Sequence, residues 1–162
     1  MTHLKDRWSL KGKSALVTGA SKGIGRAVAL ELAGLGARVF AVARGADQLE
    51  SLRQEAEAHG YSILGFVADV AVASDRMKII EGIREAFGGL DILVNNVGTN
   101  IRRSTVEYNA SEVETIFATN LTSAFELSRL AHPLLKQSGQ GAIVQISSVA
   151  GLTAIQTGTP YA

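Results

Sequence analysis

The stretch TGASKGIG (18–25) decides the fold. It follows a short apolar run, SALVT (14–18), and opens a helical pattern, GRAVALELAGLG (25–36). Its three glycines, Gly19, Gly23 and Gly25, allow a tight turn and a close approach of backbone to a ligand, and a helix N-terminus attracts phosphate. A glycine loop between a strand and a helix therefore predicts a dinucleotide-binding βαβ unit.

The same strand-then-helix order continues along the chain. Four further apolar runs are nearly continuous, as is typical of strands buried on both faces of a parallel sheet. They are RVFAVA (38–43), SILGFVAD (62–69), LDILVNN (90–96) and GAIVQISS (141–148). The order predicts an α/β class fold, with a Rossmann-type doubly wound parallel sheet in three layers and one domain over residues 1–162.

Two of the intervening helices carry specific expectations. Helical spacing in ASDRMKIIEGIREAFGG (73–89) predicts one apolar face, made of Met77, Ile80, Ile83, Ala86 and Phe87. The longest helix is expected at about 111–138, with Ser111 as N-cap and Glu114 completing a capping box. Its apolar residues cover more than one side, which fits either a well-buried helix or one that shares its outer face with a second subunit.

Composition narrows the classes of partner. The chain has 16 basic and 15 acidic residues, so its net charge of +1 creates no field that would draw it to nucleic acid or an anionic membrane. It has no cysteine, and its three histidines are far apart in sequence, so no metal site is predicted. We find no signal peptide and no apolar run long enough to span a membrane, and we expect a soluble, cytoplasmic protein.

The second strand indicates which dinucleotide is bound. An NAD site usually has an acidic residue about 20 residues after the glycine loop, where it holds the ribose 2′-hydroxyl. Here Ala43 stands in that place and Arg44 follows it, while Lys22 adds a cation within the glycine loop. Cations favour a 2′-phosphate, so the predicted cofactor is NADP(H).

Further cofactor contacts are expected where the later strands end. Asp69 could accept a hydrogen bond from the adenine amine while Val70 covers the ring. Asn95 and Asn96, in NNVG (95–98), need hydrogen-bond partners, first among neighbouring backbone and then in the cofactor ribose. The predicted cofactor-binding residues are Gly19, Ser21, Lys22, Gly23, Ile24, Gly25, Arg44, Asp69, Val70, Asn95, Asn96 and Gly98.

With TGASKGIG, NNVG, Asn120 in TNLTSAF, and ISSVAG followed by Tyr161, the chain resembles the short-chain dehydrogenase/reductase family over essentially its whole length. RWSLKGKSALVTG, NNVGTNIR and LAHPLLKQSGQGAIVQISSVAG are most similar to its tropinone-reductase-like branch. The resemblance implies that Tyr161 donates a proton to a substrate carbonyl, that Ser148 rather than Ser147 hydrogen-bonds the same oxygen, and that Asn120 holds a relay water. It also implies transfer of the pro-S hydride and a homodimer or homotetramer.

Two departures from the family pattern bear on activity. Val97 replaces the usual alanine of NNAG, a change from which we expect little effect. The family pattern Y-x-x-x-K places a lysine four residues after the tyrosine, beyond Ala162. A cation at about 4 Å and an effective dielectric constant of about 20 contributes roughly 4 kcal/mol, or about three pKa units, toward ionising a tyrosine.

The family sheet runs 3-2-1-4-5-6-7, so the resemblance also implies that this chain supplies only the first five strands, with GAIVQIS (141–147) as an uncovered apolar edge. The 162-residue chain alone is therefore expected to be inactive or unstable. The predicted function is an NADPH-dependent carbonyl reductase acting on a small or cyclic ketone. The alternatives are a 3-oxoacyl-carrier-protein reductase and a non-catalytic, NADP-binding remnant.

Overall fold

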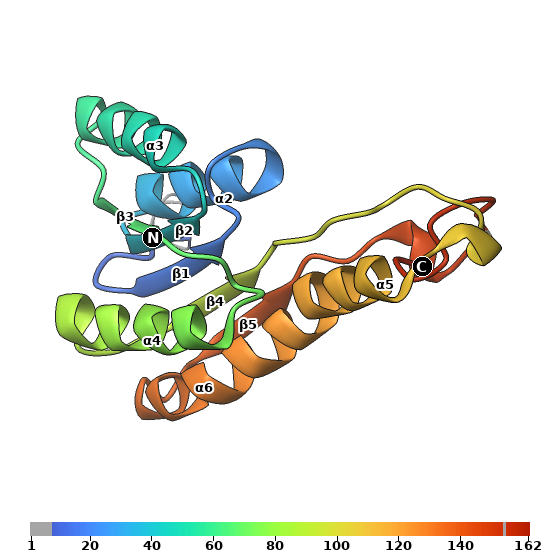
Figure 1. Cartoon of the computed structure of the whole chain (residues 1–162). Coiled ribbons are helices and arrows are strands. Elements are labelled where there is room, and N and C mark those ends of the chain that lie inside the picture. Colours follow the sequence, from blue (N-terminus) through green and yellow to red (C-terminus); the bar gives the residue numbers. More distant parts are fainter. Residues whose placement is uncertain (1–7, 154) are drawn as a thin grey trace.

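The computed structural model describes residues 8–153 and 155–162, which form a parallel sheet with helices on both faces (Figure 1). The strands are β1 (Ser14–Thr18), β2 (Arg38–Ala43), β3 (Ile63–Val67), β4 (Ile92–Asn95) and β5 (Ala142–Gln145). The α-helices are α2 (Gly23–Gly34), α3 (Ala46–Ala58), α4 (Ala73–Phe87), α5 (Ala110–Phe117) and α6 (Ser123–Gln137). The strand order is β3-β2-β1-β4-β5 with every pair parallel, which confirms the predicted fold class.

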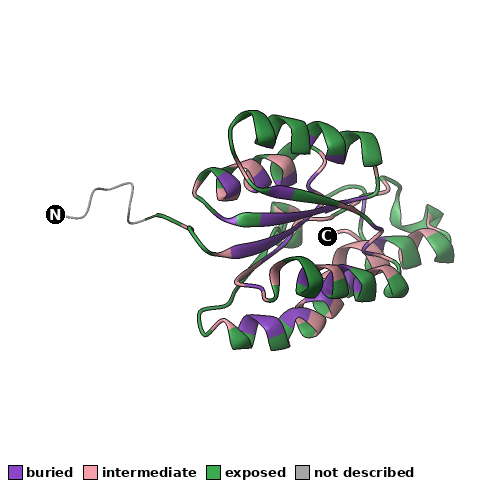
Figure 2. Cartoon of the chain, turned by 90° about the vertical axis from the view of Figure 1, so that its left-hand side faces the viewer, coloured by how far each residue is buried: buried purple, intermediate pink, exposed green. Residues whose placement is uncertain are grey.

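Alternation along the strands divides the core into two layers. Ala15 and Val17 of β1 pack with α2 and α3 in one cluster, and Leu16 packs with α4 and α6 in the other. On the α2 side most contributors are alanine and valine, so this helix lies close to the sheet; Figure 2 shows the buried residues concentrated on the strands and inner helix faces. Close packing of α2 fixes where its N-terminus lies relative to the end of β1.

The buried face of α4 differs from the prediction. Its buried residues are Arg76, Ile79, Ile80 and Ile83, whereas Met77 is 57% exposed and Ala86 is also exposed. The buried stripe includes an arginine, and this cation hid the true periodicity. The Arg76 guanidinium is tolerated because it donates to the carbonyl of Val70, at 2.7 Å.

The long helix also begins differently. Its N-cap is Asn109, whose side chain accepts from the Glu112 N–H, and Glu112 closes the capping box. The predicted cap Ser111 and partner Glu114 are therefore wrong, because the helix starts at Ala110 and the Ser111 hydroxyl donates to the Asn109 side chain. A π-helical turn, η2 (Ala118–Thr122), separates α5 from α6.

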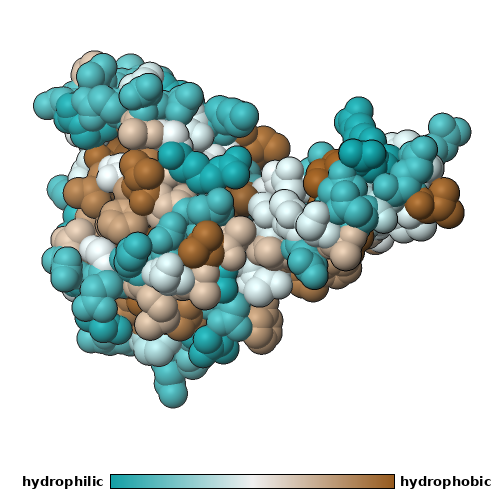
Figure 3. Space-filling view, in the orientation of Figure 1, coloured by the Kyte–Doolittle hydropathy of each residue, from teal (hydrophilic) through white to brown (hydrophobic). Residues whose placement is uncertain are grey.

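Several apolar side chains are exposed around the second half of the chain. All four residues of β5 are exposed, which agrees with the predicted uncovered edge. Phe117, Leu121 and Phe125 are 46%, 59% and 64% exposed, so the helix is not buried on this side. The alternative of an outer face shared with a second subunit remains a prediction. The loop after β4, α5 and the C-terminal residues extend away from the sheet (Figures 1 and 3).

At the amino ends of the strands, Asp91 lies just before β4 and forms hydrogen bonds with the first residues of β1 and β5. Its carboxylate accepts from the Ser14 N–H at 2.9 Å and from the Lys13 ammonium at 3.0 Å, and its carbonyl accepts from the Ala142 N–H. Burial raises the pKa of this carboxyl, but the hydrogen bonds from Ser14 and Lys13 outweigh it, so the pKa lies below its ordinary value of 3.8. The ionised carboxylate therefore stabilises the native state.

We predict that Asp91→Asn lowers the free energy of unfolding at neutral pH by about 1–3 kcal/mol, because the charged acceptor is lost. A carboxyl with a lowered native-state pKa stabilises above its ordinary pKa and loses that contribution as the pH falls through the native value. The difference between wild type and variant, measured by urea unfolding, should therefore narrow below about pH 4. Glu81→Gln, at an exposed position of α4, is the matched control. A difference that does not change with pH would contradict the assignment.

Candidate cofactor and active site

The glycine loop after β1 presents the N-terminus of α2. Gly19 and Gly23 have φ of +66° and +55°, values that residues other than glycine rarely adopt. The N-cap is Lys22, and among the described residues no side chain caps this helix. The first turn contains no acidic residue. Its N–H groups are therefore available to an anion, as predicted for a pyrophosphate.

Gly25 has a different role, because it is buried against two neighbours. A Cβ at this position would lie 2.3 Å from the Gly19 carbonyl oxygen and 2.4 Å from the Asn96 Nδ2 atom. Both distances are far below a normal contact, so only glycine lets α2 approach the ends of β1 and β4. The third glycine of the motif thus allows the glycine loop to pack closely against the sheet.

The two asparagines that end β4 point to different partners. The Asn96 side chain donates to the Thr18 carbonyl at 3.0 Å, so its first partner is neighbouring backbone, as expected. Asn95 is only 5% exposed, and its side chain donates to the Ser128 hydroxyl at 3.1 Å, under α6. The predicted cofactor contact of Asn95 is not supported, because consecutive residues of a strand face opposite sides of the sheet. Asn95 instead ties β4 to α6.

The residues predicted to contact the adenosine half lie where β2 and β3 end. The Arg44 side chain is 81% exposed, with its Nη1 atom 3.8 Å from the Asp69 carboxylate. Asp69 is fixed by its Oδ1 atom, which accepts from the Ala71 N–H, and by its own N–H, which donates to Asp75. That N–H, followed by the Lys78 ammonium, lowers the pKa of the Asp75 carboxyl. Arg44 is thus held near the end of β2 while most of it stays accessible.

Two other predicted cofactor-binding residues, Val70 and Ser21, have little or only part of their side chain exposed. The Val70 side chain is 3% exposed and packs in the core, so little of it is available to cover an adenine ring. Ser21 is half-buried within the glycine loop, next to the exposed Lys22. Their contacts with a cofactor remain predictions.

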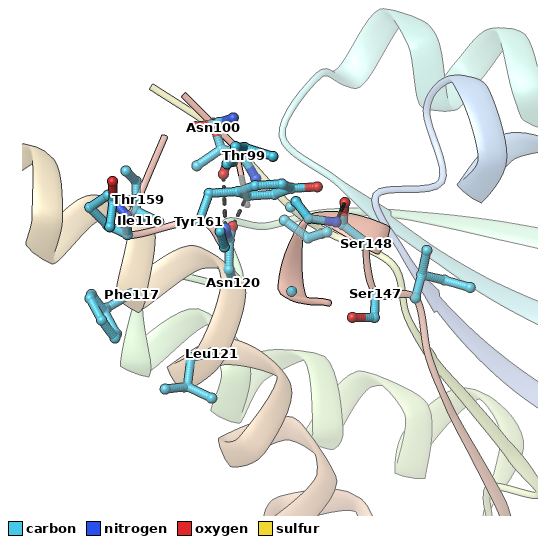
Figure 4. A pocket seen from close by; sticks show the side chains of 18 of the residues that line it. Thr99, Asn100, Ile116, Phe117, Asn120, Leu121, Ser147, Ser148, Thr159 and Tyr161 are labelled. Carbon is cyan, nitrogen blue, oxygen red and sulfur yellow. Dashed lines mark hydrogen bonds between the residues drawn. The ribbon is translucent and has the colours of Figure 1, made fainter. Parts of the chain in front are cut away.

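A cavity of about 980 Å³ lies at the carboxyl edge of the sheet. Its wall brings together residue 24 and residues from three later stretches, 96–102, 116–121 and 146–162, including all three predicted catalytic residues (Figure 4). The predicted residues in the wall are Ile24, Asn96, Gly98, Asn120, Ser148 and Tyr161. The other predicted cofactor residues lie outside this wall, in the glycine loop and beyond the ends of β2, β3 and β4.

Asn120 lies in the π-helical turn and braces the loop after β4. Its Oδ1 accepts from the Thr99 N–H and its Nδ2 donates to the Thr99 carbonyl, both at 2.8 Å (Figure 4). Both amide atoms are therefore used to hold backbone. A relay water at this residue would need a further group, such as a backbone carbonyl of the widened turn.

Ser148 and Tyr161 bring two hydroxyl groups to the cavity. Ser148 caps the short helix η3 (Val149–Gly151), and its hydroxyl accepts from the Ala150 N–H at 3.2 Å. The Tyr161 N–H donates to the Gly158 carbonyl, and in Figure 4 its ring extends across the cavity with the hydroxyl directed to the side where Ser148 lies. Two hydroxyl donors in one cavity can stabilise negative charge on a single oxygen. Ser147 also lines the cavity.

Sequence reasoning missed two threonines that shape this edge. The Thr18 hydroxyl accepts from the Asn96 N–H at 3.0 Å, and the Thr99 backbone forms the paired bonds to Asn120. Thr18 is the last residue of the first strand, directly before Gly19, and it could have been noticed as the polar end of an apolar run. Thr99 carries no such signal, because its role depends on a helix that is distant in sequence.

Residues 8–153 and 155–162 contain no group of three metal-ligating side chains of the His, Cys, Asp and Glu types. None of the helices described is long and apolar enough to cross a membrane.

Comparison with known proteins places this geometry in a family. Residues 13–162 match the family model described as short chain dehydrogenase. The chain belongs to the short-chain dehydrogenase family. A tropinone reductase homolog from Arabidopsis thaliana is 52% identical over 96% of this chain, and senescence-associated protein 13 of the same plant is 51% identical over 96%.

The solved structures agree with the family assignment. A metagenomic short-chain oxidoreductase in complex with NADP has a TM-score of 0.90 and 33% identity, over 94% of this chain and 69% of its own. The chain spans 59% of the tropinone reductase homolog and 58% of senescence-associated protein 13. The chain is therefore similar to these proteins over somewhat less than three fifths of their length, and the matching part of this chain contains the sheet and the cavity described above.

We predict that Gly25→Ala weakens NADPH binding by more than tenfold and lowers thermal stability, because the added methyl must push α2 away from Gly19; overpacking typically costs about 1–3 kcal/mol. Fluorescence titration with NADPH and thermal unfolding measure the two effects. Gly89→Ala is the matched control, since a Cβ there meets nothing within 4 Å. Equal NADPH affinity in the Gly25 variant and wild type would show that the contact does not shape the loop.

Proposed function

We propose that the protein is an NADPH-dependent carbonyl reductase acting on a small or cyclic ketone. The observation that carries the proposal is the cavity in which Ser148, Tyr161 and Asn120 meet Ile24 of the glycine loop. The activity is proposed for the whole protein, because the chain spans only 59% of its first relative.

The choice of NADPH rests on charge at the end of β2. Arg44 is exposed there, Ala43 is uncharged, and Lys22 lies at the start of α2. A 2′-phosphate would gain charge-assisted hydrogen bonds from the two cations. The Gly25 cradle and the uncapped α2 N-terminus suit the pyrophosphate. The NADP complex of a structural relative is consistent with this choice.

The chain's own groups provide acid catalysis and orientation. Bound NADPH would supply the hydride. Tyr161 donates a proton to the carbonyl oxygen, and Ser148 donates a hydrogen bond to the same atom as negative charge develops on it. Asn120 holds the backbone of Thr99 by two hydrogen bonds, and both residues line the cavity.

Removing the cation at the end of β2 tests the cofactor. Arg44→Ala should weaken NADPH binding by about tenfold or more and leave NADH binding unchanged, because only NADPH has a 2′-phosphate. Arg84→Ala removes an exposed charge of the same kind from α4 and serves as the control. Fluorescence titration with both nucleotides, on protein from a clone that continues past residue 162, is the measurement. A proportional loss for both nucleotides would reject the specificity argument.

Removing the hydroxyl groups tests the chemistry. In a clone that continues past residue 162, Tyr161→Phe and Ser148→Ala should each lower kcat at least a hundredfold while NADPH affinity stays within about twofold, because both act on the substrate oxygen. Ser147→Ala is the matched control. The assay is NADPH consumption over a panel of ketones, and full activity of the tyrosine variant would exclude this mechanism.

Two other functions use the same fold. A 3-oxoacyl-carrier-protein reductase would reduce the 3-oxo group of an acyl-carrier-protein thioester, included in the panel, in preference to simple ketones. A non-catalytic NADP-binding remnant predicts NADPH binding without turnover of any ketone. The panel and the binding titration therefore separate all three.

A further inference from the structure

The described part of the cavity wall contains one charged side chain. Arg102 is the only Lys, Arg, His, Asp or Glu side chain among the described residues of the wall. The same wall contains three exposed apolar residues, Phe117, Leu121 and Ile155, which are 46%, 59% and 38% exposed. A compound in this cavity would therefore meet the hydroxyl groups of Ser148 and Tyr161, exposed apolar surface and one guanidinium group.

Arg102 differs from its neighbour in being unpaired. Arg103 forms an ion pair with Glu112 at 2.8 Å, whereas no acidic side chain in residues 8–153 and 155–162 pairs with Arg102. An exposed cation without a partner keeps its hydrogen-bonding capacity for a ligand.

The backbone on each side of Arg102 is held in place. The Ile101 carbonyl accepts from the Tyr108 hydroxyl, and the Arg103 carbonyl accepts from the Gly158 N–H at 3.1 Å. Gly158 in turn accepts from the Tyr161 N–H, so the backbone that carries Arg102 is tied to the segment that carries the predicted proton donor. The position of the charge is thus set by the fold, while the side chain remains free to reach a ligand.

We propose that Arg102 is a specificity-determining residue, selecting carbonyl substrates that combine an apolar body with a carboxylate and disfavouring ketones that carry an ammonium group. The inference rests on the proposed function, because it names the substrate class of the same cavity. A guanidinium pairs with a carboxylate in a planar, two-pronged geometry and repels a cation.

Three ketones of similar size test the charge preference directly. They are oxocyclohexanecarboxylate, the neutral oxocyclohexanecarboxamide and protonated N-methylpiperidone, each titrated calorimetrically into the protein from a clone that continues past residue 162, saturated with NADP⁺ so that no ketone is reduced during the titration. We expect the carboxylate to bind about fivefold to tenfold more tightly than the amide at about 50 mM salt, and this ratio to shrink at about 0.5 M salt. The ammonium ketone should bind most weakly.

Variants assign the effect to one residue. Arg102→Gln should bring the carboxylate and amide affinities together, Arg102→Glu should favour the ammonium ketone, and Arg102→Lys should keep part of the preference. Arg103→Gln removes the same charge one position away, outside the cavity wall, and should leave the ratio unchanged. Equal affinities in wild type, no measurable binding of any of the three, or an equal effect of Arg103→Gln would each overturn the inference.

Turnover separates this inference from the proposed function. In a clone continuing past residue 162, reduction of all three ketones with the same kcat/KM would reject the role of Arg102 and support the reductase. The expected binding order without turnover of any ketone would reject the reductase and support the charge selection.

Discussion

The close approach of α2 to the ends of β1 and β4 is the constraint on which the site depends. It exists because Gly25 has no Cβ, so that the Gly19 carbonyl and the Asn96 amide can occupy the space. Asn96 in turn bonds the Thr18 carbonyl, which fixes β4 beside the glycine loop. The helix N-terminus and the start of the cavity wall are consequently set by one packing contact, and a dinucleotide would span both.

A second set of hydrogen bonds connects the end of the sheet to the predicted catalytic residues. The loop after β4 is held by Asn120 through the Thr99 backbone, and further along it Thr105 bonds Thr159, close to Tyr161. The π-helical turn aims the Asn120 side chain at the loop, which a regular helix at this point would direct elsewhere. The segment that carries Tyr161 is therefore tied to the loop after β4 by a side-chain hydrogen bond, and the segment that carries Ser148 follows β5, where the Ile146 N–H donates to the Asn95 carbonyl of β4.

The sequence predicted what local patterns encode and missed what tertiary contacts decide. Continuous apolar runs gave the five strands, and the glycine loop gave the βαβ unit, because both depend on residues close in sequence. The α4 face was misread because Arg76 is buried through a bond to the Val70 carbonyl. Asn95 was assigned to the cofactor because the residue type alone does not show that its side chain points under α6. The Thr99 brace depends on a helix 21 residues away.

Exposure divides the molecule into two halves with different consequences. The strands β1 and β2 have their inner residues covered on both faces, and the cofactor loop is built on them. In contrast, β5, which leads into Ser148, is exposed along all four residues, and Phe117 and Leu121 at the cavity wall are exposed as well. Apolar surface of this kind is stabilised when another surface covers it. Under the proposed function, nucleotide binding would depend on the covered half and carbonyl chemistry on the exposed half. Covering the apolar surface should then affect turnover far more than nucleotide affinity.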